Sequence, residues 1–207
     1  GTSLSDPANV LIIGAGIVGI NAMQMSLGLG ANTTILDINN ELLSKIKTQY
    51  PAVNIGTSSK ELIEGLLPIA DVVIGAVLTP GAKPPTVITK EMLSLMQDKS
   101  ILSDVAIDQG GCFETSKPTT HSEPTYEIDG VIHYCVKNIP SAVPFTATNA
   151  LNESTRPFIA RLANEGVEGL RSNINLLMAL NTYDGHLVNK EVADAHGLEY
   201  SDPSNIL

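Results

Sequence analysis

The fold is decided by one stretch near the start of the chain, Asn9-Val-Leu-Ile-Ile-Gly-Ala-Gly-Ile-Val-Gly19. It opens with a short apolar run that ends in a glycine, which is typical of a strand buried on both faces of a parallel sheet. A Gly-x-Gly-x-x-Gly pattern at Gly14, Gly16 and Gly19 follows, and helical sequence extends from Ile17 to about Leu29. A glycine loop between a buried strand and a helix predicts a dinucleotide-binding site.

Each glycine of this loop has a separate task in such a site. Gly14 allows the tight turn, Gly16 lets the backbone approach a pyrophosphate, and Gly19 permits close packing of the helix on the strand. The helix N-terminus offers unpaired N–H groups and a partial positive charge to the phosphates. The alternative interpretation is a glycine turn that packs tightly and binds nothing.

Asp37 ends the next β-rich run, where a carboxylate can accept hydrogen bonds from both adenosine ribose hydroxyls. The same carboxylate would repel a 2′-phosphate, and no arginine follows nearby, so the sequence predicts NAD rather than NADP. An aspartate before Asn39-Asn40 can also simply form a turn, and this alternative stays open.

Beyond the glycine loop, β-rich and helical stretches alternate along the chain. The expected strands are 33–37, 53–56, 71–77 and 100–107, and the expected helices are 41–50, 59–67 and 90–96. This rhythm predicts βαβ units, and hence an α/β fold with a doubly wound parallel Rossmann sheet.

The rhythm changes after Asp108. A long loop runs to Pro124, and residues 126–128 and 131–134 read as a hairpin around Asp129-Gly130. Helical sequence resumes at Thr146, with Pro157 expected to kink that helix or mark its boundary. We therefore divide the chain into an NAD(H)-binding domain, residues 1–144, and a C-terminal helical arm, residues 145–207.

Composition excludes several classes of protein. The 207 residues carry a formal net charge of −10, which argues against nucleic acid or an anionic membrane surface as a partner. The apolar runs are too short to span a membrane, and the N-terminus lacks a basic-then-apolar signal, so we expect a cytoplasmic protein. Cys112 and Cys135 are too few for a disulfide scaffold or a zinc site, and no metal is expected.

Two longer motifs make the sequence recognisable, Ala76-Val-Leu-Thr-Pro-Gly-Ala-Lys-Pro-Pro85 and Asp104-Val-Ala-Ile-Asp-Gln-Gly-Gly-Cys112. On these residues the chain resembles the alanine dehydrogenases, within the alanine dehydrogenase/pyridine nucleotide transhydrogenase family. The resemblance runs through nearly all of the sequence, including His133-Tyr-Cys-Val136 and Asn149-Ala-Leu151. The second motif is similar to the dehydrogenase branch rather than the transhydrogenase branch.

The resemblance implies both a reaction and a set of contacts. The reaction converts L-alanine, NAD and water to pyruvate, ammonium and NADH. The implied cofactor contacts are Asp37 at the ribose, Ser58 or Ser59 near the adenine, Val77 and Leu78 along the cofactor cleft, and Val105, Asp108 and Asn138 beside the nicotinamide.

Asp108 is the one catalytic residue that this chain is expected to supply, as a support for the family's acid/base histidine. Its position agrees with that role, because it follows the expected strand 100–107 at the carboxyl edge where doubly wound sheets bind ligands. A capping or turn aspartate before Gly110-Gly111 is the alternative.

The family's substrate lobe precedes the glycine-loop strand and supplies the histidine, the arginine and the lysine that handle the substrate. Only eight residues precede Asn9 here. Surface or packing roles are expected for the four histidines, and a solvated role for the lysine in the loop; these residues are His121, His133, His186, His196 and Lys83. We expect little turnover unless a substrate lobe is supplied to bind L-alanine or pyruvate.

Without that lobe, the apolar stripe of the Thr146–Ala163 helix lacks a cover, which predicts a homo-oligomer, most simply a two-fold dimer. Three alternatives to the dehydrogenase interpretation remain. They are a stand-alone NAD-binding module without catalysis, the NAD(H)-binding component of a transhydrogenase, and a scaffold built on a degenerate fold.

Overall fold

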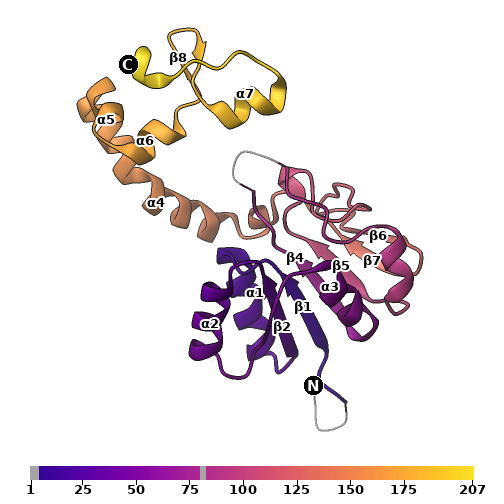
Figure 1. Cartoon of the computed structure of the whole chain (residues 1–207). Helices are drawn as coiled ribbons and strands as arrows, with labels where there is room; N and C mark the ends of the chain where they lie inside the picture. The colour runs from indigo at the N-terminus through magenta and orange to yellow at the C-terminus, as the bar shows by residue number, and fades with distance from the viewer. Residues whose placement is uncertain (1–4, 80–82) are drawn as a thin grey trace. The chain divides into compact units, whose positions relative to one another are not determined.

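The computed structural model describes residues 5–79 and 83–207, which form two compact units (Figure 1). The first unit comprises residues 5–79 and 83–139, and the second comprises residues 140–207. The first unit holds all the residues predicted to form the cofactor site.

The first unit is built on a seven-stranded sheet with the order β3-β2-β1-β4-β5-β7-β6. The strands are β1 (Asn9–Ile13), β2 (Asn32–Asp37), β3 (Asn54–Thr57), β4 (Val72–Gly75), β5 (Ile101–Asp104), β6 (Thr125–Ile128) and β7 (Val131–Tyr134). All pairs are parallel except β6 with β7, which is the predicted hairpin. The doubly wound α/β fold is thus confirmed, and its strand order reverses at β1, between β2 and β4.

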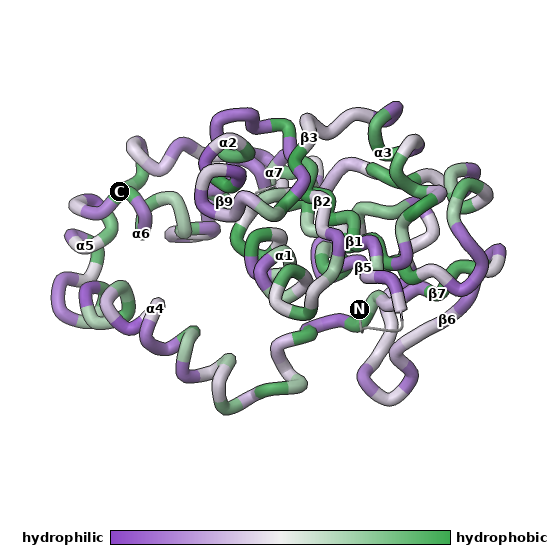
Figure 2. Tube along the Cα trace, turned by 90° about the horizontal axis from the view of Figure 1, so that it is seen from below, coloured by the Kyte–Doolittle hydropathy of each residue, from purple (hydrophilic) through white to green (hydrophobic). Residues whose placement is uncertain are grey.

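Helices cover both faces of this sheet, which explains why β1 is apolar at successive residues. Val10 and Ile12 face one side, where α1 (Ile17–Gly28) and α2 (Asn40–Gln49) pack. Leu11 and Ile13 face the other side, toward α3 (Lys60–Leu66) and two 3-10 helices, Leu67–Ile69 and Glu91–Leu95. In Figure 2 the central strands are accordingly among the most hydrophobic parts of the trace.

Three elements differ from their predicted form. The helix expected at 90–96 is the short 3-10 helix, and β4 and β5 end at Gly75 and Asp104, before the predicted 77 and 107. After Asp104 the chain leaves the sheet, forms a 3-10 turn at Ile107–Gln109 and closes it with a hydrogen bond from Gly111 N to Ala106 O. Ala106 and Ile107 are buried in this turn, so their apolar pattern imitated a continuing strand.

The second unit is helical. It contains α4 (Pro144–Glu165), α5 (Val167–Arg171), α6 (Ile174–Ala179), the strand pair β8 (Thr182–Tyr183) and β9 (His186–Leu187), and α7 (Lys190–His196). α4 continues through Pro157, so this proline does not end the helix. Among the described residues, every helix is too short or too polar to cross a bilayer.

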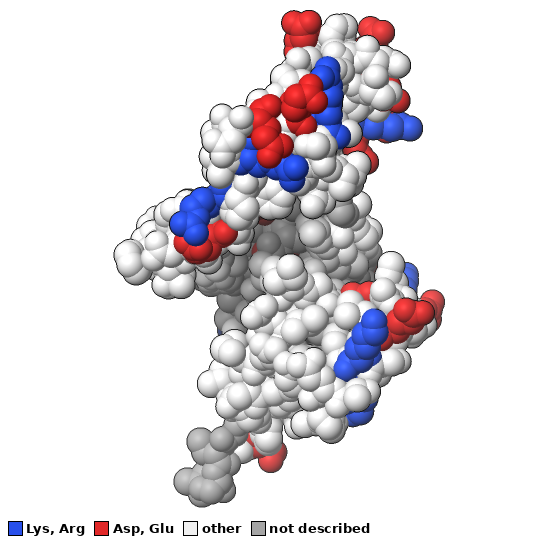
Figure 3. Space-filling view, turned by 90° about the vertical axis from the view of Figure 1, so that its left-hand side faces the viewer, with Lys and Arg blue, Asp and Glu red and all other residues white. Residues whose placement is uncertain are grey.

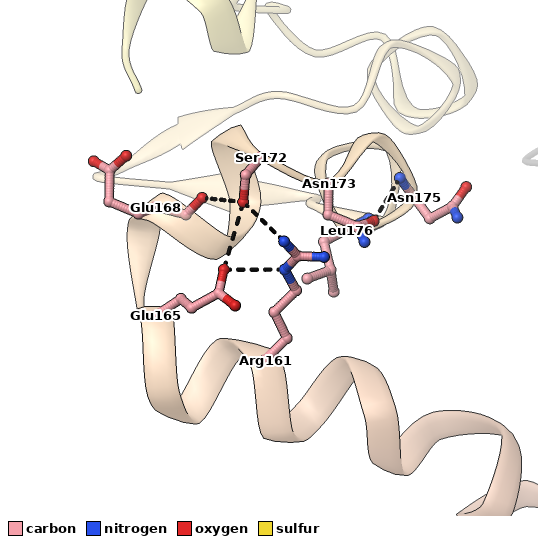
Figure 4. Close-up of polar contacts among 7 residues, drawn as sticks. All are labelled: Arg161, Glu165, Glu168, Ser172, Asn173, Asn175 and Leu176. Atoms are coloured by element: carbon pink, nitrogen blue, oxygen red, sulfur yellow. Dashed lines mark hydrogen bonds and ion pairs between the residues drawn. The ribbon is translucent and has the colours of Figure 1, made fainter.

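Polar contacts join the helices of the second unit (Figure 4). Arg161 pairs with Glu165 at 3.0 Å and donates to Ser172 Oγ at 3.4 Å, which ties α4 to the end of α5. Asn173 caps α6 by accepting a hydrogen bond from Leu176 N at 3.1 Å. Acidic and basic side chains accordingly lie beside one another on the surface of this unit (Figure 3).

Candidate cofactor site

The glycine loop has the geometry that a dinucleotide requires. Gly14 has a φ of +105°, and a Cβ there would lie 2.5 Å from the carbonyl oxygen of Ala76. A Cβ at Gly19 would lie 1.8 Å from the carbonyl oxygen of Gly14, so α1 packs on the loop as closely as backbone allows. Gly16 is exposed, and no heavy atom of the described residues lies within 4 Å of its Cβ position. The backbone at Gly16 is therefore open to a ligand.

The start of α1 is open as well. Gly16 occupies the N-cap position and has no side chain to cap the helix, and the first turn of α1 holds no acidic residue. Ile17 and Val18 in that turn are exposed to solvent. The first turn of α1 thus carries no acidic side chain of its own, which suits a helix end that binds an anion.

Asp37 lies directly over the glycine loop. Its Oδ2 accepts a hydrogen bond from Ala15 N at 2.7 Å, and its Oδ1 accepts one from Asn39 N at 2.8 Å. Each carboxylate oxygen has a further lone pair, so both can also accept from a ribose diol. The turn-forming and ribose-binding interpretations of Asp37 are therefore compatible with each other.

The structure distinguishes the two serines named for the adenine end. Ser58 N donates to the Asp37 carbonyl oxygen at 2.9 Å, which places Ser58 next to the predicted ribose site. Ser59 is instead the N-cap of α3, with its Oγ accepting a hydrogen bond from Leu62 N at 3.2 Å. Ser58 is thus the better placed of the two.

A second group of predicted residues meets at a cavity of about 200 Å³ where β4 and β5 end. Its lining residues are Val18, Ala76, Val77, Leu78, Val105, Ala106, Asp108 and Gln109. Val18 belongs to the first turn of α1, so the cavity adjoins the glycine loop. An apolar slot with a few polar groups at one side suits a flat, weakly polar ring such as nicotinamide.

A larger cavity, of about 410 Å³, lies elsewhere in the first unit. It is lined by residues of β1, β2, β3 and α3, including Asn9, Thr34 and Ile55, and by none of the predicted site residues. The smaller cavity is the better candidate for the cofactor site, because it adjoins the glycine loop, which follows β1, the strand at which the order reverses.

Asp108 does not follow its strand directly, as the sequence suggested, but lies exposed in the 3-10 turn Ile107–Gln109. Asn138, which comes after β7, donates its backbone N–H to both carboxylate oxygens of Asp108 at 3.1 Å. Asn138 adopts a left-handed φ of +51° there. The structure therefore joins two residues predicted to lie beside the nicotinamide.

The carboxylate that does end β5 is Asp104, which the sequence analysis did not single out. It is fully buried and accepts hydrogen bonds from the backbone N–H groups of Ala106, Cys112 and Phe113. An aspartate at the end of an apolar run was the available signal, but the apolar residues after it hid the end of the strand.

Of the four histidines, three are exposed and one is buried. His133 is buried, stacks on Tyr126 with ring centroids 4.9 Å apart, and bonds through Nε2 to Thr115 Oγ1 at 2.7 Å. Burial lowers the pKa of His133, and burial likewise raises the pKa of the Cys112 thiol. The described residues contain no His, Cys, Asp and Glu group able to hold a metal ion.

A reversed strand order, a glycine loop, an acidic residue over it and an adjoining apolar slot define a dinucleotide-binding domain of the Rossmann class. The family model described as "Alanine dehydrogenase/PNT, C-terminal domain" matches residues 1–190, and the chain belongs to this family. It is the NAD-binding domain of the family, and this membership implies NAD as its cofactor.

Individual relatives agree with the family. The chain is 48% identical to an alanine dehydrogenase of Halomonas elongata over 203 residues, which cover 97% of this chain and 55% of that protein. It is also 48% identical over 201 residues to an alanine dehydrogenase of Staphylococcus haemolyticus, covering 96% and 54%. The chain thus spans about half the length of the curated relatives it matches.

Solved structures give the same result. A structure of an L-alanine dehydrogenase superposes with a TM-score of 0.86 at 43% identity, covering 95% of this chain and 55% of that one. A transhydrogenase from Sinorhizobium meliloti superposes with a TM-score of 0.63 at 22% identity, covering 70% and 43%, and shows likeness of fold alone.

Proposed function

We propose that this chain is the cofactor half of an NAD-dependent alanine dehydrogenase, which interconverts L-alanine and pyruvate once a substrate lobe is supplied. The observation that supports this proposal is the meeting of the open glycine loop, Asp37 and the apolar slot at one edge of the sheet. NAD bound there would supply the hydride acceptor for oxidation of the substrate.

Each group of predicted residues would bind a different part of the cofactor. Gly14, Gly16, Gly19 and the N-terminus of α1 would hold the pyrophosphate, Asp37 the adenosine ribose and Ser58 the adenine, while Val77, Leu78, Val105 and Asn138 would line the nicotinamide end. These roles follow the order of the strands, β2 and β3 for adenosine and β4 and β5 for nicotinamide. We also propose that the 1–144 segment carries this site and that 145–207 forms the arm.

Asp108 would act as the only catalytic residue of this half. Its carboxylate is exposed beside the slot, and Asn138 N fixes its orientation with two hydrogen bonds. A fixed carboxylate can orient a neighbouring acid/base group and stabilise its charged form. Removing such a group costs roughly 10²–10⁴-fold in rate.

Two further proposals concern the location of the protein and its self-association. We propose that the protein is cytoplasmic. For self-association, the relevant surface lies on α4, which exposes a set of large apolar side chains, namely Leu151, Phe158, Ile159 and Leu162. We propose that this surface mediates self-association as a two-fold dimer. Sedimentation of the wild type and of the double variant Leu151→Ser/Ile159→Ser tests this, with a shift to monomer expected; a wild type that is monomeric at micromolar concentration contradicts it.

The proposed function is tested by titrating the chain with NADH and NADPH and following the fluorescence of the dihydronicotinamide. NADH should bind and NADPH should bind much more weakly, and absence of NADH binding would contradict the proposal. NADH formation from L-alanine and NAD at 340 nm is the second readout, with Asp108→Asn as control. Turnover above that control would show that the chain completes a catalytic site by itself.

A further inference from the structure

The buried carboxylate of Asp104 closes the loop that forms the nicotinamide end of the site. Its Oδ1 accepts hydrogen bonds from Ala106 N at 3.0 Å and from Cys112 Sγ at 3.4 Å. Its Oδ2 accepts hydrogen bonds from Cys112 N at 2.8 Å, Phe113 N at 3.3 Å and Ser116 Oγ at 2.5 Å. Among the described residues no cation pairs with Asp104.

These donors come from both ends of one loop. Ala106 lies two residues after Asp104, whereas Cys112, Phe113 and Ser116 lie beyond the turn that carries Asp108. Burying a carboxylate without a counter-ion costs free energy unless hydrogen-bond donors satisfy it, and an apolar residue at position 104 would avoid that cost. We therefore attribute the presence of a carboxylate here to the loop that its hydrogen bonds hold in place.

The backbone around the carboxylate is closely packed. Gly111 has a φ of +76°, and a Cβ there would lie 2.8 Å from Asp104 Oδ2. A Cβ at Gly75, the last residue of β4, would lie 2.4 Å from Cys112 Sγ. The loop that is bonded to Asp104 thus packs against the end of β4. Val77, two residues after β4 ends, lines the slot.

We propose that Asp104 is a positioning residue for the nicotinamide end of the cofactor site. It acts through the 105–116 loop, which places Val105 and Asp108 at the slot, and it does not itself line that slot. The adenosine end rests on β1, β2 and the glycine loop, and over residues 5–79 and 83–207 it shares no side-chain hydrogen bond with Asp104. This inference rests on the proposed function, since it requires that the chain binds NAD(H).

The test compares a ligand that contains the nicotinamide ring, NADH, with one that lacks it, ADP-ribose. The full chain carrying Asp104→Asn, which retains the shape but replaces one acceptor with a donor, is titrated with NADH and with ADP-ribose. NADH should bind about tenfold more weakly than to the wild type, whereas ADP-ribose should stay within about twofold. The emission of bound NADH should also move toward that of free NADH.

Two other variants support the test. Ser100→Ala removes a buried hydroxyl next to the opposite end of β5, where Ser100 Oγ donates to Gln97 O at 2.7 Å, and should leave both affinities unchanged. Ser116→Ala removes one of the donors to Asp104 and should give a smaller loss for NADH alone. Ser116→Ala provides the readout if Asp104→Asn does not fold.

Each outcome decides the inference. Equal losses for both ligands, in variants whose circular dichroism is that of the wild type, would overturn it and leave Asp104 a purely structural residue. A wild type that binds NADH no better than ADP-ribose would also overturn it. A wild type that binds neither ligand would instead contradict the proposed function, and the inference with it.

Discussion

The two ends of the candidate site are built by different means. At the adenosine end, backbone packs directly on backbone, and the decisive fact is the absence of room for a side chain at Gly14 and Gly19. At the nicotinamide end, a loop is held in place by hydrogen bonds to one buried side chain, Asp104. The first end should therefore fail abruptly when an atom is added, and the second should weaken gradually when a hydrogen bond is lost.

The largest effect is expected from Gly19→Ala. Its Cβ would overlap the carbonyl oxygen of Gly14, which is backbone and cannot rotate away, so α1 must move off the loop. We expect NADH binding to be lost and the free energy of unfolding to fall by about 3 kcal/mol, the upper part of the range for overpacking. Titration with NADH and thermal unfolding measure the two effects.

Gly28→Ala is the matched control in the same helix. Within the part of the chain that the structure describes, no heavy atom lies within 4 Å of the Cβ position at Gly28, so the methyl group has space. Alanine is favoured over glycine in a helix by about 1 kcal/mol, and this variant should bind NADH normally with equal or higher stability. If Gly19→Ala behaved like Gly28→Ala, the packing account of the adenosine end would be wrong.

Asp37→Asn should have the next largest effect. It removes the negative charge that excludes a 2′-phosphate and weakens acceptance from the ribose hydroxyls. We expect NADH binding to weaken by about tenfold and the preference over NADPH to shrink, both measured by fluorescence titration. An unchanged preference would exclude Asp37 as the residue that selects NAD.

Asp71→Asn is the control for the change of charge. Asp71 accepts a hydrogen bond from Asn9 N at 2.7 Å, the same length as the bond from Ala15 N to Asp37. It lies immediately before β4, at the opposite end of that strand from the slot. The affinity for NADH should not change in this variant.

The difference between the two ends also explains what could be predicted from the sequence. The glycine loop follows β1 directly and Asp37 is the last residue of β2, so a local pattern identified them. The bonds to Asp104 come from residues up to Ser116, and no periodicity reports such contacts. The apolar stretch after Asp104 reads as strand because Ala106 and Ile107 are buried in a turn rather than in the sheet.

The smallest effect is expected from the titration of His133, in the β6–β7 hairpin, on the stability of the fold. Burial lowers the pKa of His133 below the ordinary value of 6.5; the hydrogen bond with Val131 O partly opposes this, and the charge of Lys117 adds to it. Below about pH 6.5 the unfolded chain therefore binds a proton that the folded chain resists. The contribution of His133 to stability is full above that pH and decreases as the pH falls through 6.5 toward the lowered pKa of the folded chain.

Urea unfolding of the wild type and His133→Phe between pH 5 and 8 measures this contribution. Phenylalanine cannot take a proton, so this part of the pH dependence should disappear, although loss of the bond to Thr115 lowers stability at every pH. His133 bonds to Thr115, and the next residue, Ser116, donates to Asp104. We therefore expect that lowering the pH weakens the binding of NADH before it weakens the binding of ADP-ribose. Equal weakening of both ligands would show that His133 does not influence the nicotinamide end.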